Sequence, residues 1–504
     1  MIRERKSRTA MPGQVYAHYI EQLEKYSAYQ ILSVNKEGIC YVALDYLEST
    51  IPTETILADI QPFYIEHFNY DHHLVKSNIN NTPVPKDYIL IGECELKSEP
   101  SSNIFSGDWP EGLDYRQAEL WKSFSAEERN VYKKYRNSGD FVIVRGKQFR
   151  KNLRVLDDTL YKWMTDEDTL QDFPCITEAQ VYGFTPKLDK ILCENSMLCT
   201  LWLWQAEVEI LDLSKTNLRK VILDVMGIKK VILPAELEYL KLHGKMDKEI
   251  LLDDSLCKWN YDVVISMNST EISNFGLSSE KVQSLLVGDI CELNLEQVVD
   301  YYPNLKRLTL FGNPGIVTNM QELSKMQKLE SLFAIDIFGF SAQELKKWEN
   351  MESLCKLEMD SIPKGAGSYL KKSWKGKLDL LKITRLRDER WLKDNLHNPL
   401  RHWDGSEFVP TGAYKATMKH YMSTRDKLQK VSSREEVEKI AREYTIFFNN
   451  LNEKYDEFIE TDEREDIFNT IKILYEDYIA SSVCGNLITL EEVWDVMDSV
   501  REDW

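Results

Sequence analysis

Short apolar patterns recur along the middle of the chain at a nearly constant spacing. Most have the form L-x-x-L-x-L with conservative replacements, so that the last two apolar positions flank a single outward residue. The first residue of each final pair lies at position 211, 240, 263, 285, 308, 335, 357 or 381, which gives intervals of 22 to 29 residues. The pattern predicts one short strand in each of eight repeats.

Strand geometry explains what such a pattern achieves. Neighbouring side chains of a strand point to opposite faces, so L-x-L buries both apolar residues and exposes the middle one. One unit cannot bury its apolar side alone, whereas stacked units share a core and form a parallel sheet with one open face. A period of about 20–29 residues with one strand per repeat is typical of a leucine-rich-repeat solenoid. The alternative is an ordinary α/β domain whose strands are spaced this way by chance.

The segment Leu305–Asn313 comes closest to the leucine-rich-repeat pattern. It reads LKRLTLFGN, and Asn313 stands where that family places a buried asparagine ladder. The 335 pattern is one step longer, because it runs Leu329–Leu332–Ile335–Ile337. Residues 214–236 carry two apolar runs, at 221–223 and 231–233, that fall off the period. We therefore expect an irregular solenoid with one distorted unit.

The flanking regions predict other structure. Residues 12–95 alternate as an antiparallel β domain, with a hairpin between Tyr26–Val34 and Ile39–Leu47, and residues 115–137 are predicted to be helical. Residues 398–405 are expected to cap the repeats. Apolar residues every three or four positions after Ser433 predict a long amphipathic helix, and Thr489 with Glu492 forms a capping box for a later one.

The predicted fold class is thus an α+β multidomain protein with a β-rich N-terminal domain, a leucine-rich-repeat solenoid and a C-terminal helical bundle. The expected domains are a β-rich domain at 1–110, a helical or mixed connector at 111–185, the solenoid with its cap at 186–410, and an acidic helical bundle at 411–504.

Composition narrows the class of protein. The chain has 504 residues, 43% of them apolar, and contains no apolar run long enough to cross a membrane. The basic start at residues 1–8 is not followed by an apolar stretch, so we expect no signal peptide. The nine cysteines include no C-x-x-C pair, which favours reduced thiols in a cytoplasmic protein over a disulfide frame or a zinc site.

The net charge of −19 is unevenly distributed. Residues 431–504 hold 20 Asp and Glu against 7 Lys and Arg, a net charge of −13. This balance argues against nucleic-acid binding, which needs a positive surface. It favours a basic protein partner, which the negative field would attract, although acidic helices also serve simply to keep a surface solvated.

Several segments near the N-terminus resemble those of one known family. They are Pro12-Gly-Gln-Val-Tyr16, Tyr29-Gln-Ile-Leu32, Val42-Ala-Leu-Asp45-Tyr46 and Val84-Pro-Lys-Asp-Tyr88-Ile-Leu-Ile-Gly92. Together they resemble the immunity protein 26 family of bacterial polymorphic-toxin systems, over residues 12–95, while the middle of the chain is similar to bacterial leucine-rich-repeat proteins. The resemblance implies a compact β-rich domain and a protein that binds and neutralises a cognate toxin. The solenoid and the acidic bundle depart from that family, whose members usually consist of the β-rich domain alone.

One cluster has the residue types of a metal or catalytic site. His67, Asp71, His72 and His73 lie close together in the sequence and could hold a transition metal for a hydrolase. Aromatic residues surround His67, however, and a partly buried, hydrogen-bonded histidine is the commoner outcome. No Gly-x-Gly-x-x-Gly or Walker loop occurs. We therefore expect no catalytic residue, no metal and no cofactor.

The open face of the predicted sheet is the favoured binding site. Aromatic residues beside mixed charges are typical of the centre of a protein interface. The candidate protein-binding residues are Tyr239, Lys241, Arg307, Phe311, Asp336, Phe338 and Glu358.

The sequence therefore predicts a non-catalytic interaction protein, with toxin immunity or a related recognition task as its role and a basic toxin domain as one candidate partner. The alternatives are a hydrolase with a site at His67, Asp71 and His73, and an adaptor that recruits a basic partner through the acidic helices. The oligomeric state and the choice between the β-rich domain and the solenoid as the main binding surface stay open.

Overall fold

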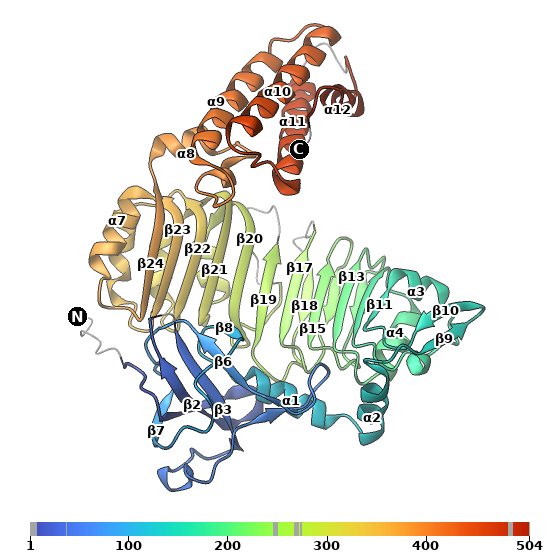
Figure 1. Ribbon diagram of the computed structural model, residues 1–504, viewed down its shortest axis with the longest axis vertical. Coiled ribbons are helices and arrows are strands. Elements are labelled where there is room, and N and C mark those ends of the chain that lie inside the picture. The colour runs from blue at the N-terminus through green and yellow to red at the C-terminus, as the bar shows by residue number, and fades with distance from the viewer. Residues whose placement is uncertain are drawn as a thin grey trace. The chain divides into compact units, whose positions relative to one another are not determined.

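A computed structural model describes residues 8–36, 38–244, 250–266, 272, 275–481, 487–502 and 504. Of the basic start at residues 1–8, residues 1–7 lie outside the described residues. The chain divides into two compact units, Met1–Arg387 and Asp388–Trp504 (Figure 1). None of the helices in the described parts of the chain is long and apolar enough to cross a membrane.

The largest element of the first unit is an eleven-stranded sheet, called here the long sheet. Its strands all run parallel and follow one another in chain order, except that β14, β16 and β18 are left out. The strands are β11 (Val155–Asp157), β12 (Glu178–Tyr182), β13 (Thr200–Trp204), β15 (Lys220–Asp224), β17 (Tyr239–His243), β19 (Tyr261–Ser266), β20 (Val282–Asn294), β21 (Arg307–Thr318), β22 (Ser331–Phe338), β23 (Lys356–Pro363) and β24 (Leu380–Arg387). The predicted parallel strands near 240, 263, 285, 308, 335, 357 and 381 are confirmed as members of one sheet.

The predicted strand near 211 belongs to a different sheet. Residues Ile210–Asp212 form β14, which pairs in parallel with β16 (Lys230–Ile232), and β16 pairs with β18 (Leu251–Asp253). In this part of the chain each repeat is shorter and contributes two strands, one to each sheet. The apolar runs at 221–223 and 231–233 are therefore not a distorted unit, because the first forms β15 and the second β16.

The predicted strand near 335 has its buried pair three residues earlier than expected. Leu308 of β21 pairs with Leu332, and Leu310 pairs with Ala334, so the buried pair of this repeat is Leu332 and Ala334. Asp336 follows with a left-handed φ of 53°, and Ile337 continues the strand beyond this bend.

The same bend recurs at the equivalent residue of neighbouring strands. Asp289, Ser361 and Arg385, each two residues after the second buried position, also have left-handed φ values, of 53°, 52° and 38°. Asn313 follows the equivalent residue Gly312 and is exposed, so the predicted buried asparagine ladder is absent at this position. The chain turns this corner through backbone conformation instead.

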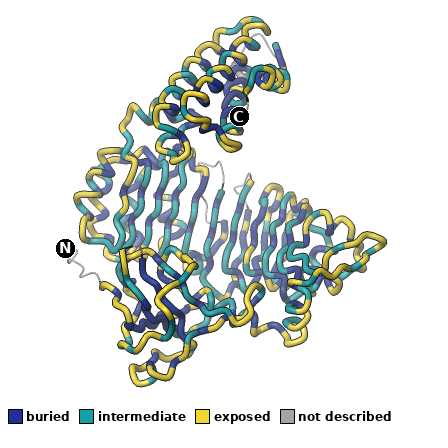
Figure 2. Tube along the Cα trace, in the orientation of Figure 1, coloured by how far each residue is buried: buried dark blue, intermediate teal, exposed yellow. Residues whose placement is uncertain are grey.

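One apolar core fills the space behind the long sheet. Leu240, Leu285, Leu308, Leu332 and Leu357 are all buried in it, as L-x-L requires. The return segments after the strands close the core on its other side, and Trp348 there donates its indole N–H to the Met320 carbonyl at 2.9 Å. They include α5 (Leu295–Tyr301), the 3₁₀ helices Met320–Lys325 and Lys346–Asn350, α6 (Ala342–Leu345) and α7 (Lys364–Ser373). Figure 2 shows the resulting alternation of buried and half-buried residues along the strands.

Residues 8–135, called here the head, form the other part of the first unit. The predicted hairpin is confirmed, with Asn35 N–H donating to the Gly38 carbonyl at 2.9 Å. The predicted helix at 115–137 is two helices, because Ser125 and Glu128 form a capping box that starts a new one. The head contains the sheet β7-β1-β2-β3-β6-β8, formed by β1 (Gln14–Ile20), β2 (Lys25–Val34), β3 (Ile39–Glu48), β6 (Lys76–Ile79), β7 (Ile89–Glu93) and β8 (Phe105–Gly107), the pair β4 (Tyr64–Ile65) and β5 (His73–Leu74), and the helices α1 (Leu113–Ser123) and α2 (Ala126–Tyr135).

A connecting region leads from the head into the long sheet. It contains the hairpin β9 (Phe141–Val144) and β10 (Lys147–Arg150). The helices α3 (Asp158–Trp163) and α4 (Pro186–Glu194) follow β11 and β12 as return segments of the long sheet.

The second unit is helical, as predicted. The long amphipathic helix after Ser433 ends at Lys454, and the capping box of Thr489 and Glu492 is confirmed. Trp403, which was expected to cap the repeats, packs in the core of the helical unit with Phe448. The helices are α8 (Glu389–Asn395), α9 (Thr411–Leu428), α10 (Arg434–Lys454), α11 (Thr461–Ser481) and α12 (Leu490–Asp498).

Candidate protein-binding face

The side of the long sheet that faces away from its core is called here the open face. Because neighbouring strands pair in register, the side chains that point to this side form three rows across the sheet. From β15 to β23 the first row runs Lys220, Tyr239, Asp262, Ser284, Arg307, Ser331 and Lys356. The middle row runs Ile222, Lys241, Val264, Leu286, Thr309, Phe333 and Glu358. The third row runs Asp224, His243, Ser266 and Gly288 from β15 to β20, and Phe311, Ile335 and Asp360 from β21 to β23, with a register shift between β20 and β21 after Val287.

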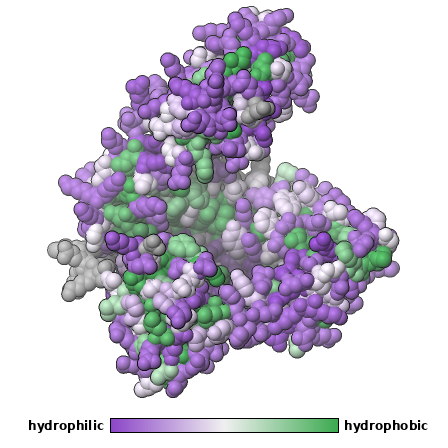
Figure 3. Space-filling view, in the orientation of Figure 1, coloured by the Kyte–Doolittle hydropathy of each residue, from purple (hydrophilic) through white to green (hydrophobic). Residues whose placement is uncertain are grey.

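Apolar side chains gather at the centre of the open face. Val264, Leu286 and Phe333 of the middle row, with Phe311 and Ile335 of the third row, are all half-buried. The rings of Phe311 and Phe333 meet edge-on, with centroids 5.7 Å apart. Figure 3 shows apolar side chains on this part of the sheet, beside the head. We call these five residues the central apolar patch.

A second aromatic group lies toward the start of the long sheet. Tyr182 of β12 stacks on Trp204 of β13, with ring centroids 5.3 Å apart, and Trp202 lies 6.1 Å from Trp204. The Lys220 ammonium sits 5.8 Å from the Trp202 ring and 5.2 Å from the Tyr239 ring, within the range of a cation–π contact. Tyr182 is exposed, and Trp202 and Trp204 are half-buried, so these rings form a second apolar region of the open face.

The head covers part of the first row through charged contacts. Glu21 accepts a hydrogen bond from Lys306 at 2.8 Å, next to the first row, and another from Asn260 at 3.3 Å. Glu111 lies 3.3 Å from Arg307, and Arg307 also bonds Asp262 of the sheet at 3.2 Å.

Two further ion pairs extend this contact along the sheet. Asp108 pairs with Lys356 at the start of β23. Arg116 of α1 lies 3.3 Å from Glu238, which precedes β17. The head therefore sits over the amino ends of strands from β17 to β23, whereas most residues of the middle and third rows are half-exposed.

The pKa values of the charged groups at this contact depend on their burial and on their ion-pair partners. The hydrogen bond from Lys306 is the main reason that the pKa of the Glu21 carboxyl lies below its usual value. Burial raises the pKa of the Asp262 carboxyl, and the nearby Arg307 only partly offsets this. Burial also lowers the pKa of Arg307, but Glu111 and Asp262 outweigh it and leave that pKa raised.

The structure places the seven candidate residues differently. Tyr239, Lys241, Phe311 and Glu358 lie half-buried on the open face. Arg307 is also on the face, but its guanidinium is engaged by Glu111 of the head.

Asp336 and Phe338 are not in the three rows. Asp336 lies within β22, at the left-handed bend that follows the residues forming the three rows. The expected exposure of Phe338 is wrong, because it is 2% exposed, and the shifted phase of its repeat is the reason. With the phase corrected, Phe333 and Ile335 take the outward positions.

The histidine cluster of the head is held by other interactions. The Asp71 carboxylate pairs with Arg136 and lies 3.7 Å from the Lys133 ammonium. His67 is buried, which with the nearby Arg136 lowers the pKa of its imidazole. Its Nδ1 accepts a hydrogen bond from the Asn69 N–H at 3.2 Å. In the part of the chain that the structure describes, no three His, Cys, Asp or Glu side chains converge as metal ligands would.

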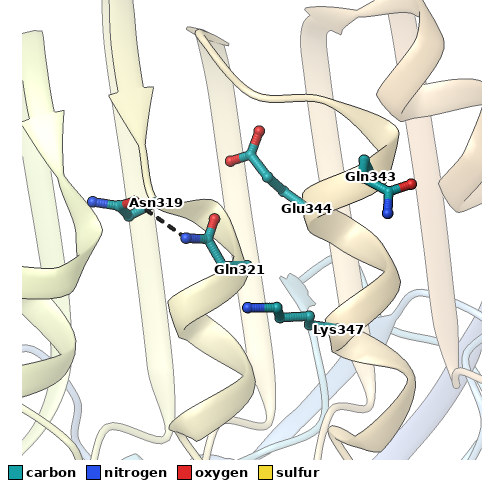
Figure 4. Close-up of a pocket in the computed structure, with 5 residues that line it drawn as sticks. All are labelled: Asn319, Gln321, Gln343, Glu344 and Lys347. Carbon is teal, nitrogen blue, oxygen red and sulfur yellow. Dashed lines mark hydrogen bonds between the residues drawn. The ribbon is translucent and has the colours of Figure 1, made fainter.

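A shallow polar pocket lies among the return segments of the long sheet. It has a volume of about 320 Å³ and is lined by Asn319, Gln321, Gln343, Glu344 and Lys347 (Figure 4). Gln321 donates to the Asn319 side chain at 3.1 Å, and Glu344 accepts from the Ser341 N–H at the start of α6. Glu344 thus serves the start of α6, and the pocket lies between the return segments of two neighbouring repeats.

The second unit has a pocket with acidic walls. It has a volume of about 400 Å³, and Asp462, Glu463, Glu465 and Asp466 of α11 line it together with the exposed Phe408. Burial raises the pKa of the Asp466 carboxyl, but hydrogen bonds from His402 and from the Trp403 indole outweigh this and leave that pKa lowered.

Comparisons with known proteins give little beyond this geometry. No protein-family model matches the chain, and no curated protein matches it. The resemblance of the head to the immunity protein 26 family therefore has no support from the family models. Among solved structures, the crystal structure of an internalin, inlF, from Listeria monocytogenes matches with 12% sequence identity and a TM-score of 0.29. That match covers 54% of this chain and 78% of the internalin chain, and at this TM-score it carries no argument about function.

Proposed function

We propose that this chain is a non-catalytic interaction protein that binds a protein partner through the uncovered rows of the open face. We infer that the long sheet is the sheet of a leucine-rich-repeat-type solenoid. The observation that carries the proposal is the central apolar patch, which lies in the middle of the open face beside charged residues of the three rows.

The central apolar patch has the make-up of a protein interface. The centres of protein interfaces are depleted in charge and enriched in aromatic residues, and a polar rim surrounds them. Phe311 and Phe333 would be the anchors, while Lys241 and Glu358 would belong to the rim. A non-catalytic role is supported by the pairing of Asp71 with Arg136, which engages the one carboxylate of the histidine cluster.

The first prediction tests the central apolar patch. Partners captured from the native cell by the wild-type chain are identified and purified, and their dissociation constants are measured. We expect Phe311→Ala and Phe333→Ala each to weaken binding by about 30-fold, which corresponds to about 2 kcal/mol for an interface anchor. Both side chains are only half-buried, so thermal stability should change little.

The matched control is Ile210→Ala. Ile210 is an exposed apolar residue of β14, in the other sheet, so its loss should leave the dissociation constant unchanged. Normal binding by both phenylalanine variants would place the partner site elsewhere, with the head as the next candidate.

Toxin neutralisation is the specific form of this proposal that the resemblance of residues 12–95 implies. It would make the partner a toxin domain, and a basic one would also suit the negative charge of residues 431–504. A toxin-like reading frame beside the gene, whose product binds the chain and is inhibited by it, is the observation that would support it.

A second candidate function is an adaptor that recruits a basic partner through the second unit. The acidic pocket of α11 favours it, because Asp462 and Glu465 are exposed there beside Phe408. An exposed aromatic side chain flanked by carboxylates suits a peptide that carries both Lys or Arg and an apolar residue.

The second prediction uses salt to test the adaptor. For a basic partner we expect Asp462→Asn with Glu465→Gln to slow association at low salt and to have little effect at high salt, because screening shortens the range of attraction to about 10 Å at 0.1 M. The control is Glu435→Gln with Glu491→Gln, which removes the same charge from α10 and α12. Equal effects of the two pairs would mean that overall charge, and not the pocket, attracts the partner.

A further inference from the structure

In the hairpin β9–β10, the strand β9 forms an exposed apolar edge. Arg145 and Gly146 form a two-residue turn with left-handed φ values of 49° and 80°, as a tight hairpin requires. Val142 packs against the core of the long sheet, whereas Phe141 is 50% exposed and Ile143 is 71% exposed. Figure 2 shows exposed residues along this hairpin, which projects from the β11 end of the first unit.

The hydrogen bonds of the hairpin fix which backbone groups face outward. The Lys151 N–H donates to the Asp140 carbonyl at 2.9 Å, so residues 140 and 151 are a hydrogen-bonded pair. Bonded and non-bonded pairs alternate in an antiparallel ladder. Val142 is therefore bonded to Phe149, and the N–H and C=O groups of Phe141 and Ile143 point to the outer side of β9. No other described strand pairs with β9 on that side.

The two edges of the hairpin are protected unequally. The strand β10 reads Lys-Gln-Phe-Arg, and charged residues of this kind discourage pairing of its free edge with another strand. The strand β9 reads Phe-Val-Ile-Val and has neither a charge nor a proline. An exposed apolar edge without such protection is a template for a further strand.

We propose that β9 pairs with β9 of a second copy of this chain, antiparallel and centred on Val142. In this register Phe141 lies opposite Ile143 of the second copy, and Ile143 lies opposite its Phe141. Both residues of each such pair have outward N–H and C=O groups, so the two pairs form four backbone hydrogen bonds. Each pair also places a phenylalanine ring against an isoleucine on the solvent side, which covers the most exposed apolar surface of the hairpin.

The strand is self-complementary in this register, which covers both exposed apolar residues of each copy. Centring on Phe141 would instead place Ile143 opposite Gly139, which lies outside β9 and has no side chain to cover it. Centring on Ile143 would place Phe141 opposite Arg145, whose backbone is left-handed and whose guanidinium bonds Thr165 at 2.9 Å. A shift by one residue would place the outward N–H and C=O groups of one copy opposite a residue whose own groups point into the hairpin of the other copy. This match between the edge and itself is why we assign a second copy, and not an unrelated peptide, to β9. The seam is short, so the dimer is weak and its population rises with protein concentration.

The test is sedimentation velocity of the full chain from low to high micromolar concentration. We expect the wild type to shift toward dimer and Ile143→Lys to remain monomeric. Ile143→Pro should also remain monomeric, because it removes an N–H that points outward and leaves the bonds of the hairpin intact. Circular dichroism and thermal unfolding confirm that each variant folds.

The matched control is Gln148→Lys, which adds the same charge on the paired residue of β10 and should dimerise like the wild type. A complementation experiment tests the register. Phe141→Glu should be monomeric alone, and mixing it with Ile143→Lys should restore a dimer, because the new charges face each other in one of the two pairs. A wild type that stays monomeric throughout, or an Ile143→Lys variant that dimerises normally, would overturn the proposal, as would a mixture that does not associate while the wild type does.

Discussion

Gly312→Ala is expected to lower the free energy of unfolding of the first unit by about 3 kcal/mol or more. A Cβ at Gly312 would overlap the Asp336 carbonyl of β22 and the Gly315 N–H of its own strand. Both are backbone groups, which cannot move aside as the end of a flexible side chain can. The strands β21 and β22 would have to separate next to the paired residues Phe311 and Ile335 of the central apolar patch. Denaturant unfolding, followed by circular dichroism, measures the change.

Gly365→Ala is the matched control for this substitution. Gly365 lies in the first turn of α7, and no atom stands within 4 Å of where its Cβ would be. The same chemical change should there raise the stability by up to about 1 kcal/mol, because alanine favours a helix over glycine. A Gly312→Ala variant as stable as the wild type would contradict the close approach of β21 and β22.

The strands of the long sheet were predictable where leucine spacing alone determines burial. Leu240, Leu285, Leu308 and Leu357 alternate cleanly with outward residues, and each was placed in the right strand. The strand β22 was placed three residues too late. Its second buried residue, Ala334, carries less apolar signal than Ile335 and Ile337, and the left-handed bend at 336 leaves no mark in the sequence.

The strand β13 escaped prediction for a different reason. Trp202 and Trp204 of β13 are outward residues as apolar as the leucines between them, so the alternation that marks a strand is lost. The second sheet was missed because its members, β14, β16 and β18, fall midway between strands of the first, and a single period cannot describe both.

The candidate site could be predicted only in part, because some of its contacts join residues that are far apart in the sequence. Lys241, Phe311 and Glu358 follow from alternation within one strand, which is local information. The cover over Arg307 comes from Glu111, a residue 196 positions away, and a charge pair at that separation leaves no periodic signal. The open face was therefore predictable from the sequence, whereas the head that lies over part of it was not.

Trp121→Ala is expected to loosen the head from the long sheet. Trp121 of α1 is 1% exposed, and its ring lies 5.2 Å from Phe68 and 5.5 Å from Tyr132 of α2. The same cluster includes Cys175 and Met197, which precede β12 and β13. Truncating a buried tryptophan costs about 3–5 kcal/mol, partly because the surrounding side chains cannot fill the cavity.

Hydrogen exchange with mass spectrometry resolves where that stability is lost. We expect faster exchange in α1 and α2 and in the segments around Glu21 and Lys306. The control is Trp403→Ala, which removes an equally buried tryptophan from the core of the second unit and should leave exchange in the head unchanged. Unchanged protection around Glu21 in the Trp121→Ala variant would mean that the charged contacts hold the head by themselves.

That last outcome would be surprising on energetic grounds. Each partly exposed ion pair between the head and the sheet, such as Glu21 with Lys306, contributes only about 0–1 kcal/mol, and salt weakens it further. The aromatic cluster around Trp121 is apolar and buried, so it should supply most of the attachment at one end of the head. The charged contacts would then set its position over the first row. A partner that competes for Lys306 and Arg307 would have only those weak pairs to displace, and the open face could widen without unfolding either part.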